Sequence, residues 1–166
     1  MRFPPALAAL ALGLAAHLAG CGTPPASSLA PETRAGVPDE SCPFCHLASE
    51  EIVAADGPCV AFRDAFPASP GHTLIIPRRH VQSFRDLTTE EWSALDRLAR
   101  RLAEDLQAAD SSITGFNFGV NDGVDAGQSV PHCHFHLIPR RAGDTPNPRG
   151  GIRKAISARY DAQPPP

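Results

Sequence analysis

The sequence predicts one α+β domain built from five short strands, one long helix and a short N-terminal helix. Its 166 residues, 42% of them hydrophobic and 20% charged, can bury one core of moderate size but not two. Short β-branched runs bounded by glycine and proline indicate the strands, and one long stretch with helical spacing indicates the helix. The formal net charge of −3 disfavours a nucleic-acid binder, because no strong positive field attracts a phosphate backbone.

The N-terminal end of the chain has the layout of a secretory signal. Residues 1–20 contain one arginine, a short apolar Ala/Leu run and small residues, and the run is too short to span a bilayer comfortably. The end of this segment, Leu18-Ala19-Gly20-Cys21, resembles the bacterial lipobox, in which cleavage precedes the cysteine and its thiol is acylated. We therefore expect lipidation at Cys21, with a generic signal peptide or a mistaken start codon as the alternatives.

This leader determines the expected location of the protein. Residues 21–40 are rich in proline, serine and alanine without apolar periodicity, which predicts a flexible tether. The protein is then extracytoplasmic and lipid-anchored to a bacterial membrane, whereas a misassigned N-terminus would make it cytoplasmic. The folded domain is expected over residues 41–160, with a disordered tail at 161–166.

The first half of the domain is predicted to contain a short helix and three strands. A serine N-cap and a proline in the first turn predict a helix over residues 41–49. Residues 52–55 and 59–64 are β-like runs separated by Asp-Gly-Pro, which predicts a hairpin. Residues 72–76 are rich in β-branched residues and stop at a proline, so they are predicted to form a third strand.

The second half is predicted to contain the long helix and two further strands. Thr88 and Glu91 fit a capping box, and apolar residues then recur at helical spacing, which predicts a helix over residues 88–109. A fourth strand is expected over residues 116–120. After a Gly/Asp-rich loop, a fifth strand is expected over residues 129–138.

Three histidines alternate along the fifth predicted strand. In His132-Cys133-His134-Phe135-His136, successive side chains point to opposite faces, so the three imidazoles share one side and the residues between them face the core. Protonating neighbouring imidazoles is mutually unfavourable, which favours neutral rings that act as nucleophile, hydrogen-bond donor or metal ligand. The pattern predicts a functional site, with a purely metal-binding strand as the alternative.

Residues 132–138 (HCHFHLI) resemble the signature of the histidine triad (HIT) family, His-φ-His-φ-His-φ-φ with φ hydrophobic. The likeness continues upstream at residues 60–64 and 71–77 and includes Asn121, so it covers about residues 41–156. The resemblance implies the HIT fold, a meandering, mostly antiparallel five-stranded sheet, and it implies a homodimer.

A further likeness lies downstream of the triad. Residues 146–153 (PNPRGGIR) resemble the tail of bacterial HIT proteins that are labelled dinucleoside-polyphosphate hydrolases. HIT proteins are nucleotide hydrolases and transferases, so the resemblance implies an enzyme that acts on a nucleotide.

The resemblance also implies a set of catalytic residues. The middle histidine, His134, attacks the α-phosphorus of a nucleoside phosphate derivative, and water then hydrolyses the nucleotidyl-imidazole. A main-chain carbonyl near His132 orients the nucleophilic ring, and His136 stabilises the developing charge. Ser129 matches a position that contacts the phosphate and the leaving group.

The implied substrate-binding residues surround a purine nucleotide. Asp64 holds the ribose hydroxyls, and His72 binds phosphate oxygens together with the last triad histidine. Asn121 lies on the phosphate side, Gln128 contacts the phosphate and leaving group, and Phe44 completes the set. Without the resemblance, Asp64 and Asn121 are equally well explained as turn residues.

Cys42 and Cys45 form a C-x-x-C pair that suits tetrahedral zinc, although redox motifs give the same pattern. In many HIT proteins such a pair, a histidine after the third strand and the first triad histidine bind a structural zinc, which implies His80 and His132 as the other ligands. An oxidising exterior favours a Cys42–Cys45 disulfide instead, and free thiols are a third alternative. Cys59 is expected to pack inside a strand.

Taken with the resemblance, the sequence predicts hydrolysis of a nucleoside phosphoramidate or a dinucleoside polyphosphate at the α-phosphate, through a covalent nucleotidyl-histidine on His134. No catalytic metal and no nucleic-acid partner are expected. Two alternatives are a nucleotide-binding protein without significant turnover and a zinc-binding surface protein in which the triad serves the metal.

Overall fold

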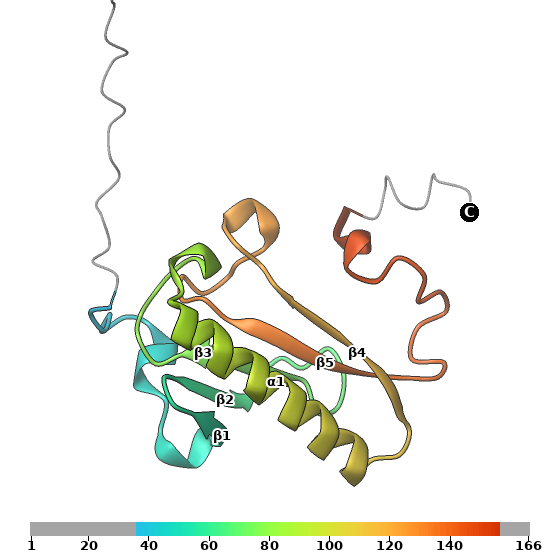
Figure 1. The fold of residues 1–166 in the computed structure, drawn as a ribbon. Coiled ribbons are helices and arrows are strands. Elements are labelled where there is room, and N and C mark those ends of the chain that lie inside the picture. The colour runs from blue at the N-terminus through green and yellow to red at the C-terminus, as the bar shows by residue number, and fades with distance from the viewer. Residues whose placement is uncertain (1–35, 157–166) are drawn as a thin grey trace, which may run out of the picture. The chain divides into compact units, whose positions relative to one another are not determined.

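The computed structural model describes residues 36–156 as one sheet covered on one face by a single long helix (Figure 1). The strands are β1 (Ile52–Asp56), β2 (Cys59–Arg63), β3 (Thr73–Pro77), β4 (Ile113–Val120) and β5 (Phe135–Arg141). All pairs are antiparallel, in the order β1-β2-β3-β5-β4, so the chain meanders until β5 inserts between β3 and β4. The predicted α+β class and five-stranded sheet are confirmed.

The predicted leader, the predicted lipidation site Cys21, most of the tether and the tail lie outside the described residues. The last tether residues are described, and the Gly36 N–H donates to the carbonyl of His80 at 2.8 Å. Contact with the domain thus begins upstream of the predicted boundary at Ser41. Within residues 36–156, no helix is both long and apolar enough to span a membrane.

The N-terminal helix differs from the prediction. Two 3₁₀ helices, η1 (Pro43–His46) and η2 (Ser49–Glu51), replace one helix over residues 41–49. The expected N-cap, Ser41, donates its hydroxyl to Asp39 Oδ1 at 2.7 Å instead of capping a helix. The β1–β2 hairpin and β3 match their predictions closely.

The long helix α1 (Thr89–Ala109) forms as predicted. The Thr88 hydroxyl accepts a hydrogen bond from the Glu91 N–H, and the Glu91 carboxylate accepts one from the Thr88 N–H, so the capping box is complete. The apolar stripe of α1 packs on the sheet over one core cluster that includes Cys59, as expected. Glu91 also pairs with Arg79 at 2.8 Å, which ties the helix to the loop after β3.

The histidine-bearing strand begins later than predicted. β5 starts at Phe135, not at residue 129, because the backbone of Cys133 bonds outside the ladder, donating to the Val81 carbonyl at 2.6 Å. The preceding residues are nevertheless extended, and the alternation holds: Cys133 and Phe135 are buried in the core cluster under α1. Its neighbour β4, an edge strand of the sheet, is longer than predicted and begins at Ile113.

Candidate active site and metal centre

The three histidines of the triad emerge on the face of the sheet opposite α1. His132 and His134 precede β5, and His136 is its second residue. His132 is fully buried and His134 is 3% exposed, and the rings of His134 and His136 meet edge to face with centroids 5.1 Å apart. The alternation predicted from the sequence therefore produces one contiguous row of imidazoles.

Backbone geometry fixes the tautomer of His134. Its Nδ1 lies 2.7 Å from the carbonyl oxygen of His132. Because a carbonyl oxygen only accepts, Nδ1 carries the hydrogen, and the lone pair of the neutral ring is on Nε2. The ring thus has an oriented nucleophilic nitrogen, and the orienting group is the main-chain carbonyl that the family resemblance implied.

A chain of hydrogen bonds fixes the tautomers of His72 and His136. The Ala68 N–H donates to His72 Nδ1 at 3.1 Å, so His72 carries its hydrogen on Nε2. His72 Nε2 then donates to His136 Nδ1 at 3.0 Å. His136 consequently carries its hydrogen on Nε2, and this buried N–H has no partner among the described residues. A buried, unpaired donor costs free energy unless a ligand satisfies it, which points to an anion site at this atom.

Burial keeps these rings neutral near pH 7. Burial, with the neighbouring His134 and His72 rings, lowers the pKa of His136 to about 4. Burial also lowers the pKa of His72, while the Asp64 carboxylate acts in the opposite direction. A neutral ring is what a hydrogen-bond donor in the tautomer of His136 requires.

Asp64 and Phe44 lie on the β2 side of the triad. Asp64 Oδ2 is 3.3 Å from His72 Nδ1, and its Oδ1 accepts from the Phe66 N–H at 2.8 Å in a turn. The Phe44 ring meets the His134 ring edge to face at 5.3 Å. The structure thus brings both predicted nucleotide-binding residues next to the histidines.

The β4 side of the triad opens into a cavity of about 370 Å³. His72, His136 and Asn121 line it, together with Phe118 and Val120. Asn121 therefore lies where a substrate in this cavity would meet it.

Gln128 and Ser129 occupy the loop before the triad. The Gln128 side chain accepts from the Gly123 N–H and donates to the Gln82 carbonyl, both at 2.8 Å, so it braces the loop. One amide hydrogen is left for a substrate. Ser129 is exposed. Their implied contacts with phosphate and leaving group stay predictions.

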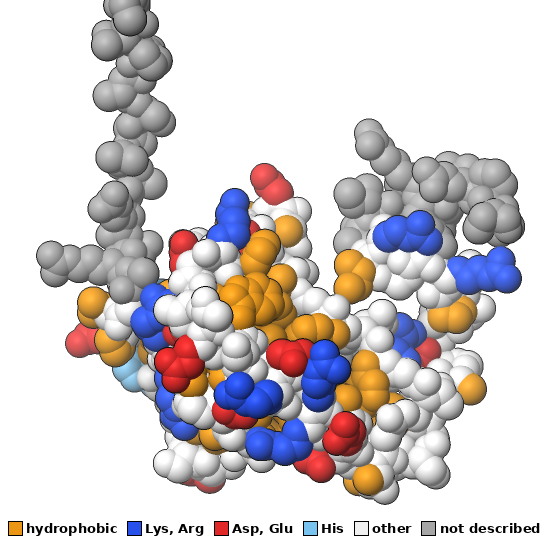
Figure 2. All heavy atoms as spheres, in the orientation of Figure 1, with side chains coloured by type: hydrophobic (Ala, Val, Ile, Leu, Met, Phe, Trp, Pro, Cys, Tyr) orange, Lys and Arg blue, Asp and Glu red, His pale blue; other side chains and the backbone are white. Residues whose placement is uncertain are grey.

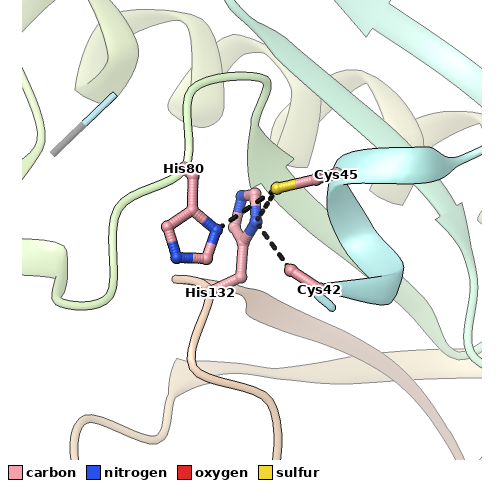
Figure 3. A group of neighbouring side chains, drawn as sticks. All are labelled: Cys42, Cys45, His80 and His132. Atoms are coloured by element: carbon pink, nitrogen blue, oxygen red, sulfur yellow. Dashed lines mark hydrogen bonds between the residues drawn. The ribbon is translucent and has the colours of Figure 1, made fainter. Parts of the chain in front are cut away.

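A second cluster, drawn in Figure 3, joins three parts of the chain. Cys42 and Cys45 come from the start of η1, His80 from the loop after β3, and His132 from the segment before β5. The ligand atoms all lie within 4.8 Å of one another. The two cysteines are free thiols in this structure, not a disulfide.

The cluster has the dimensions of a tetrahedral zinc site. Zn–S bonds of about 2.3 Å and Zn–N bonds of about 2.0–2.1 Å place S and N about 3.6 Å apart. The S–Nδ1 distances are 3.5 Å for Cys42–His132, 3.7 Å for Cys45–His132 and 3.2 Å for Cys45–His80. His132 Nε2 donates to the Pro77 carbonyl at 2.9 Å, which leaves its Nδ1 lone pair aimed at the thiols.

The triad and His80 lie within a segment that matches a known family, and Cys42 and Cys45 come just before that segment. A model described as the HIT domain matches residues 47–143. The chain belongs to the HIT family. It is 43% identical over 84 residues to a bis(5'-nucleosyl)-tetraphosphatase [asymmetrical] of Schizosaccharomyces pombe, a match that covers 51% of this chain and 46% of that protein. It is 34% identical over 109 residues to Protein hit of Bacillus subtilis, covering 61% and 72% of the two chains.

Solved structures of HIT proteins share the fold. A HIT family protein from Bacillus anthracis is 35% identical with a TM-score of 0.57, over 63% of this chain and 77% of that one. A Zn-bound histidine triad family protein from Mycobacterium smegmatis is 28% identical with a TM-score of 0.56, over 74% and 98%. The chain spans about half the length of the S. pombe relative, so the activity of that whole protein carries over only as a proposal.

Sequence reasoning missed several groups that lie in this site or line the cavities beside it. The Ala68 N–H and the Pro77 carbonyl are backbone groups without a sequence signal. Arg140 lies on the same face of β5 as His136, so the alternation of side chains along the strand could have identified it. Asn117 could be found only from the register that pairs it with Ile138.

Proposed function

We propose that this HIT protein hydrolyses a nucleoside phosphoramidate or a dinucleoside polyphosphate at the α-phosphate, through a covalent nucleotidyl-histidine on His134. The observation that carries the proposal is the 2.7 Å contact between His134 Nδ1 and the His132 carbonyl, which leaves the Nε2 lone pair as a nucleophile. The S. pombe relative, a bis(5'-nucleosyl)-tetraphosphatase, supports the same substrate class.

The site residues divide the reaction into two displacements. His134 Nε2 forms a bond to the α-phosphorus while the bond to the leaving group breaks. The unpaired His136 Nε2–H then donates to a phosphoryl oxygen, whose negative charge it stabilises in both transition states. Water attacks the α-phosphorus of the nucleotidyl-imidazole, the P–N bond breaks with its electron pair returning to His134 Nε2, and the water loses one proton to solvent. The products are the mononucleotide and the neutral His134 ring. Asp64 and Phe44 hold the purine nucleotide on the β2 side.

A turnover screen tests this proposal. The full chain is incubated with adenosine 5'-phosphoramidate and with diadenosine polyphosphates, with and without a chelator. We expect release of the mononucleotide, and we expect His134→Ala to lose on the order of a thousandfold in turnover or more while it still binds nucleotide. Turnover of the variant at the wild-type rate contradicts the mechanism, and nucleotide binding without turnover in the wild type favours the non-enzymatic alternative.

Zinc is the cofactor we propose for the Cys2His2 cluster. The support is the fit of its S–N distances, the His132–Pro77 hydrogen bond and the Zn-bound relative from M. smegmatis. Burial raises the pKa of the Cys42 thiol, so a bound cation would supply the charge that keeps it a thiolate. Zinc held there would fix the N-terminal segment to the sheet and, through His132, the start of the triad.

A homodimer is the assembly we propose. Trp92 on α1 and Phe118 on β4 both contact the Phe135 ring, and each is 40% exposed. Hydrophobic side chains gather on this face of the molecule in Figure 2. β4 is also an edge strand of the sheet. An exposed aromatic pair beside an open edge is typical of a surface that a second copy covers.

We also propose a lipid anchor at Cys21, and its only support is the lipobox-like sequence of residues 18–21. Acylation would place the mature chain in the membrane fraction outside the cytoplasm, and Cys21→Ser would release it. Intact-mass analysis of the N-terminal peptide tests this directly. An unmodified chain that begins at Met1 and stays in the cytosol contradicts the anchor.

A further inference from the structure

A second cavity adjoins the one beside His72 and His136, and the mechanism above gives it no role. Its volume is about 330 Å³, which is within the range of small-molecule sites, roughly 300–1,000 Å³. The two cavities share four lining residues, Asn117, Asn121, Ile138 and Ile152. A ligand that begins at the triad can therefore continue into the second cavity.

Strands β4 and β5 form the floor of this cavity. Ile138 and Arg140 follow His136 on the same face of β5, since side chains alternate along a strand. Asn117 lies opposite Ile138 on β4. The floor is thus a direct continuation of the row of histidines, away from the zinc cluster.

The tail segment that resembles bacterial HIT proteins forms the outer wall. Pro148 and Ile152 line the cavity from this segment, and Thr145 lines it from the residue just before. Glycines permit its close approach to β4: a β-carbon on Gly119 would lie 3.1 Å from Ile152 Cδ1, and one on Gly151 would lie 3.3 Å from Asn117 Nδ2. The tail therefore forms one wall of an open cavity, and the sheet forms its floor.

Arg140 is the one charged side chain among the described residues that line this cavity, and an ion pair with Asp144 neutralises it. Arg140 donates to both oxygens of Asp144 at 2.7 and 2.8 Å, and its third contact is with Asn117 Oδ1. Because arginine only donates, the Asn117 oxygen faces Arg140 and its Nδ2 group is left to donate to a ligand. An uncharged ligand with hydrogen-bond acceptors suits this lining better than a chain of phosphates, which would need an unpaired positive charge.

The cavity also lies on the correct side for a leaving group. In the sheet order, β2, which leads to Asp64, and β4, which carries Asn117, are on opposite sides of β5. A nucleotide held at Asp64 and Phe44 places the remainder of the substrate over β5 and towards β4. In-line displacement likewise requires the leaving group to depart away from the nucleophile.

We propose that this second cavity binds the distal nucleoside of a dinucleoside polyphosphate, the half that leaves with the departing phosphates. Asn117 Nδ2 donates to the nucleoside, and Arg140 is a positioning residue that holds the Asn117 amide. The proposal rests on the proposed function above, and it adds a specificity site to it. A substrate with a distal nucleoside is then preferred over one that ends in phosphate.

The test compares diadenosine tetraphosphate with adenosine 5'-tetraphosphate, which has the same nucleotidyl group and phosphate number but lacks the second nucleoside. Asn117→Leu and Arg140→Met are made in the full chain. Arg100→Met is the matched control, because Arg100 also pairs with an aspartate four residues away, on the exposed surface of α1. We expect both cavity variants to lower the ratio of kcat/KM for the two substrates about tenfold, mainly through KM, and the control to keep the wild-type ratio.

Each outcome separates this inference from the function on which it rests. An unchanged ratio in both cavity variants, or a larger loss with the phosphate-ended substrate, overturns the distal-nucleoside site. If the wild type hydrolyses neither nucleotide, hydrolysis of dinucleoside polyphosphates is ruled out as the proposed function, and the ratio of the two Kd values, measured by calorimetry, decides the inference instead. Melting temperatures of the variants show whether each one is folded.

Discussion

His136 is the residue at which structure and chemistry are most closely linked. Its Nδ1 accepts from His72, and its buried Nε2–H is unpaired among the described residues, so a charged ring would have to be desolvated without a counter-charge in direct contact. The same burial that lowers its pKa to about 4 keeps it a neutral donor near pH 7.

This lowered pKa predicts a loss of stability in acid. Between pH 6.5 and about 4 the unfolded chain protonates His136 and the folded chain does not, so the free energy of unfolding falls as the pH falls. The contribution of one such group is at most about 1.4 kcal/mol per pH unit. Urea unfolding at several pH values should show a shallower slope for His136→Asn than for the wild type. Equal slopes for the His136 variant and the wild type contradict this account.

At this scale the sequence predicted which histidines share a face but not their protonation. The alternation in residues 132–136 is local, and a period of two is enough to place the rings. The tautomer of His136 depends on His72 and Ala68, which lie 64 and 68 positions earlier in the chain and act partly through a backbone N–H. No residue type encodes that contact.

At the scale of elements, η1 is positioned by its side chains more than by its own hydrogen bonds. It is a single 3₁₀ turn without a side-chain cap, and Cys42 and Cys45 connect it to His132 and His80. The predicted α-helix over residues 41–49 did not form, because helix propensity over nine residues is weak against the geometry of the cysteine–histidine cluster. A 3₁₀ turn, held by the cysteine–histidine cluster, therefore replaces the helix that the capping signals predicted.

Removing one ligand tests this turn. Cys42→Ser should lower the zinc content from about one ion per chain and reduce the melting temperature by more than about 5 °C, because structural zinc contributes directly to folding. Cys59→Ala is the control: it removes a buried cysteine from the core, so it should lose stability but keep its zinc. Elemental analysis and calorimetry provide the two measurements. A zinc-free wild type with a Cys42–Cys45 disulfide and the same stability would rule out the metal.

The turn before β3 requires a glycine at position 71. Gly71 has φ +90°, and a β-carbon there would lie 3.2 Å from Pro139 Cγ and 3.3 Å from Leu106 Cδ2. Gly143 has φ +79° with open space around it. Alanine at either position should cost about 1 kcal/mol for the left-handed backbone, and Gly71→Ala should cost about 1–2 kcal/mol more for the close contacts. Equal unfolding free energies for the two variants contradict the packing argument.

The strands and the long helix were largely predictable from the sequence, but the residues at which they begin and end were not. The capping box and apolar period of α1 identified a helix that the structure reproduces within one residue. β5 was expected six residues too early, because Cys133 looks like a strand residue but bonds to the Val81 carbonyl in a loop. The second cavity was not predicted at all. Its floor depends on how β4 pairs with β5, and its wall depends on where the tail packs, and the sequence alone reveals neither.

At the scale of the whole molecule, the exposed aromatic pair of Trp92 and Phe118 predicts the assembly state. Light scattering should give the mass of a dimer for the wild type and of a monomer for Phe118→Glu, because a charge there would be buried in the contact. Phe66→Glu is the matched control, since Phe66 is 92% exposed in a separate loop and should leave the mass unchanged. A monomeric wild type, or a Phe118 variant that stays dimeric, rules out this surface.

The proposed mechanism depends on one chemical event, the formation of a bond between His134 Nε2 and the α-phosphorus. The most direct measurement uses diadenosine tetraphosphate labelled at the α-phosphate, quenched during turnover in alkaline denaturant, in which a phosphorus–imidazole bond survives. We expect one labelled peptide, which carries a nucleotidyl group on His134, and no label on the His134→Ala chain. Release of the labelled mononucleotide at the wild-type rate with no label on the protein at any time would contradict the mechanism.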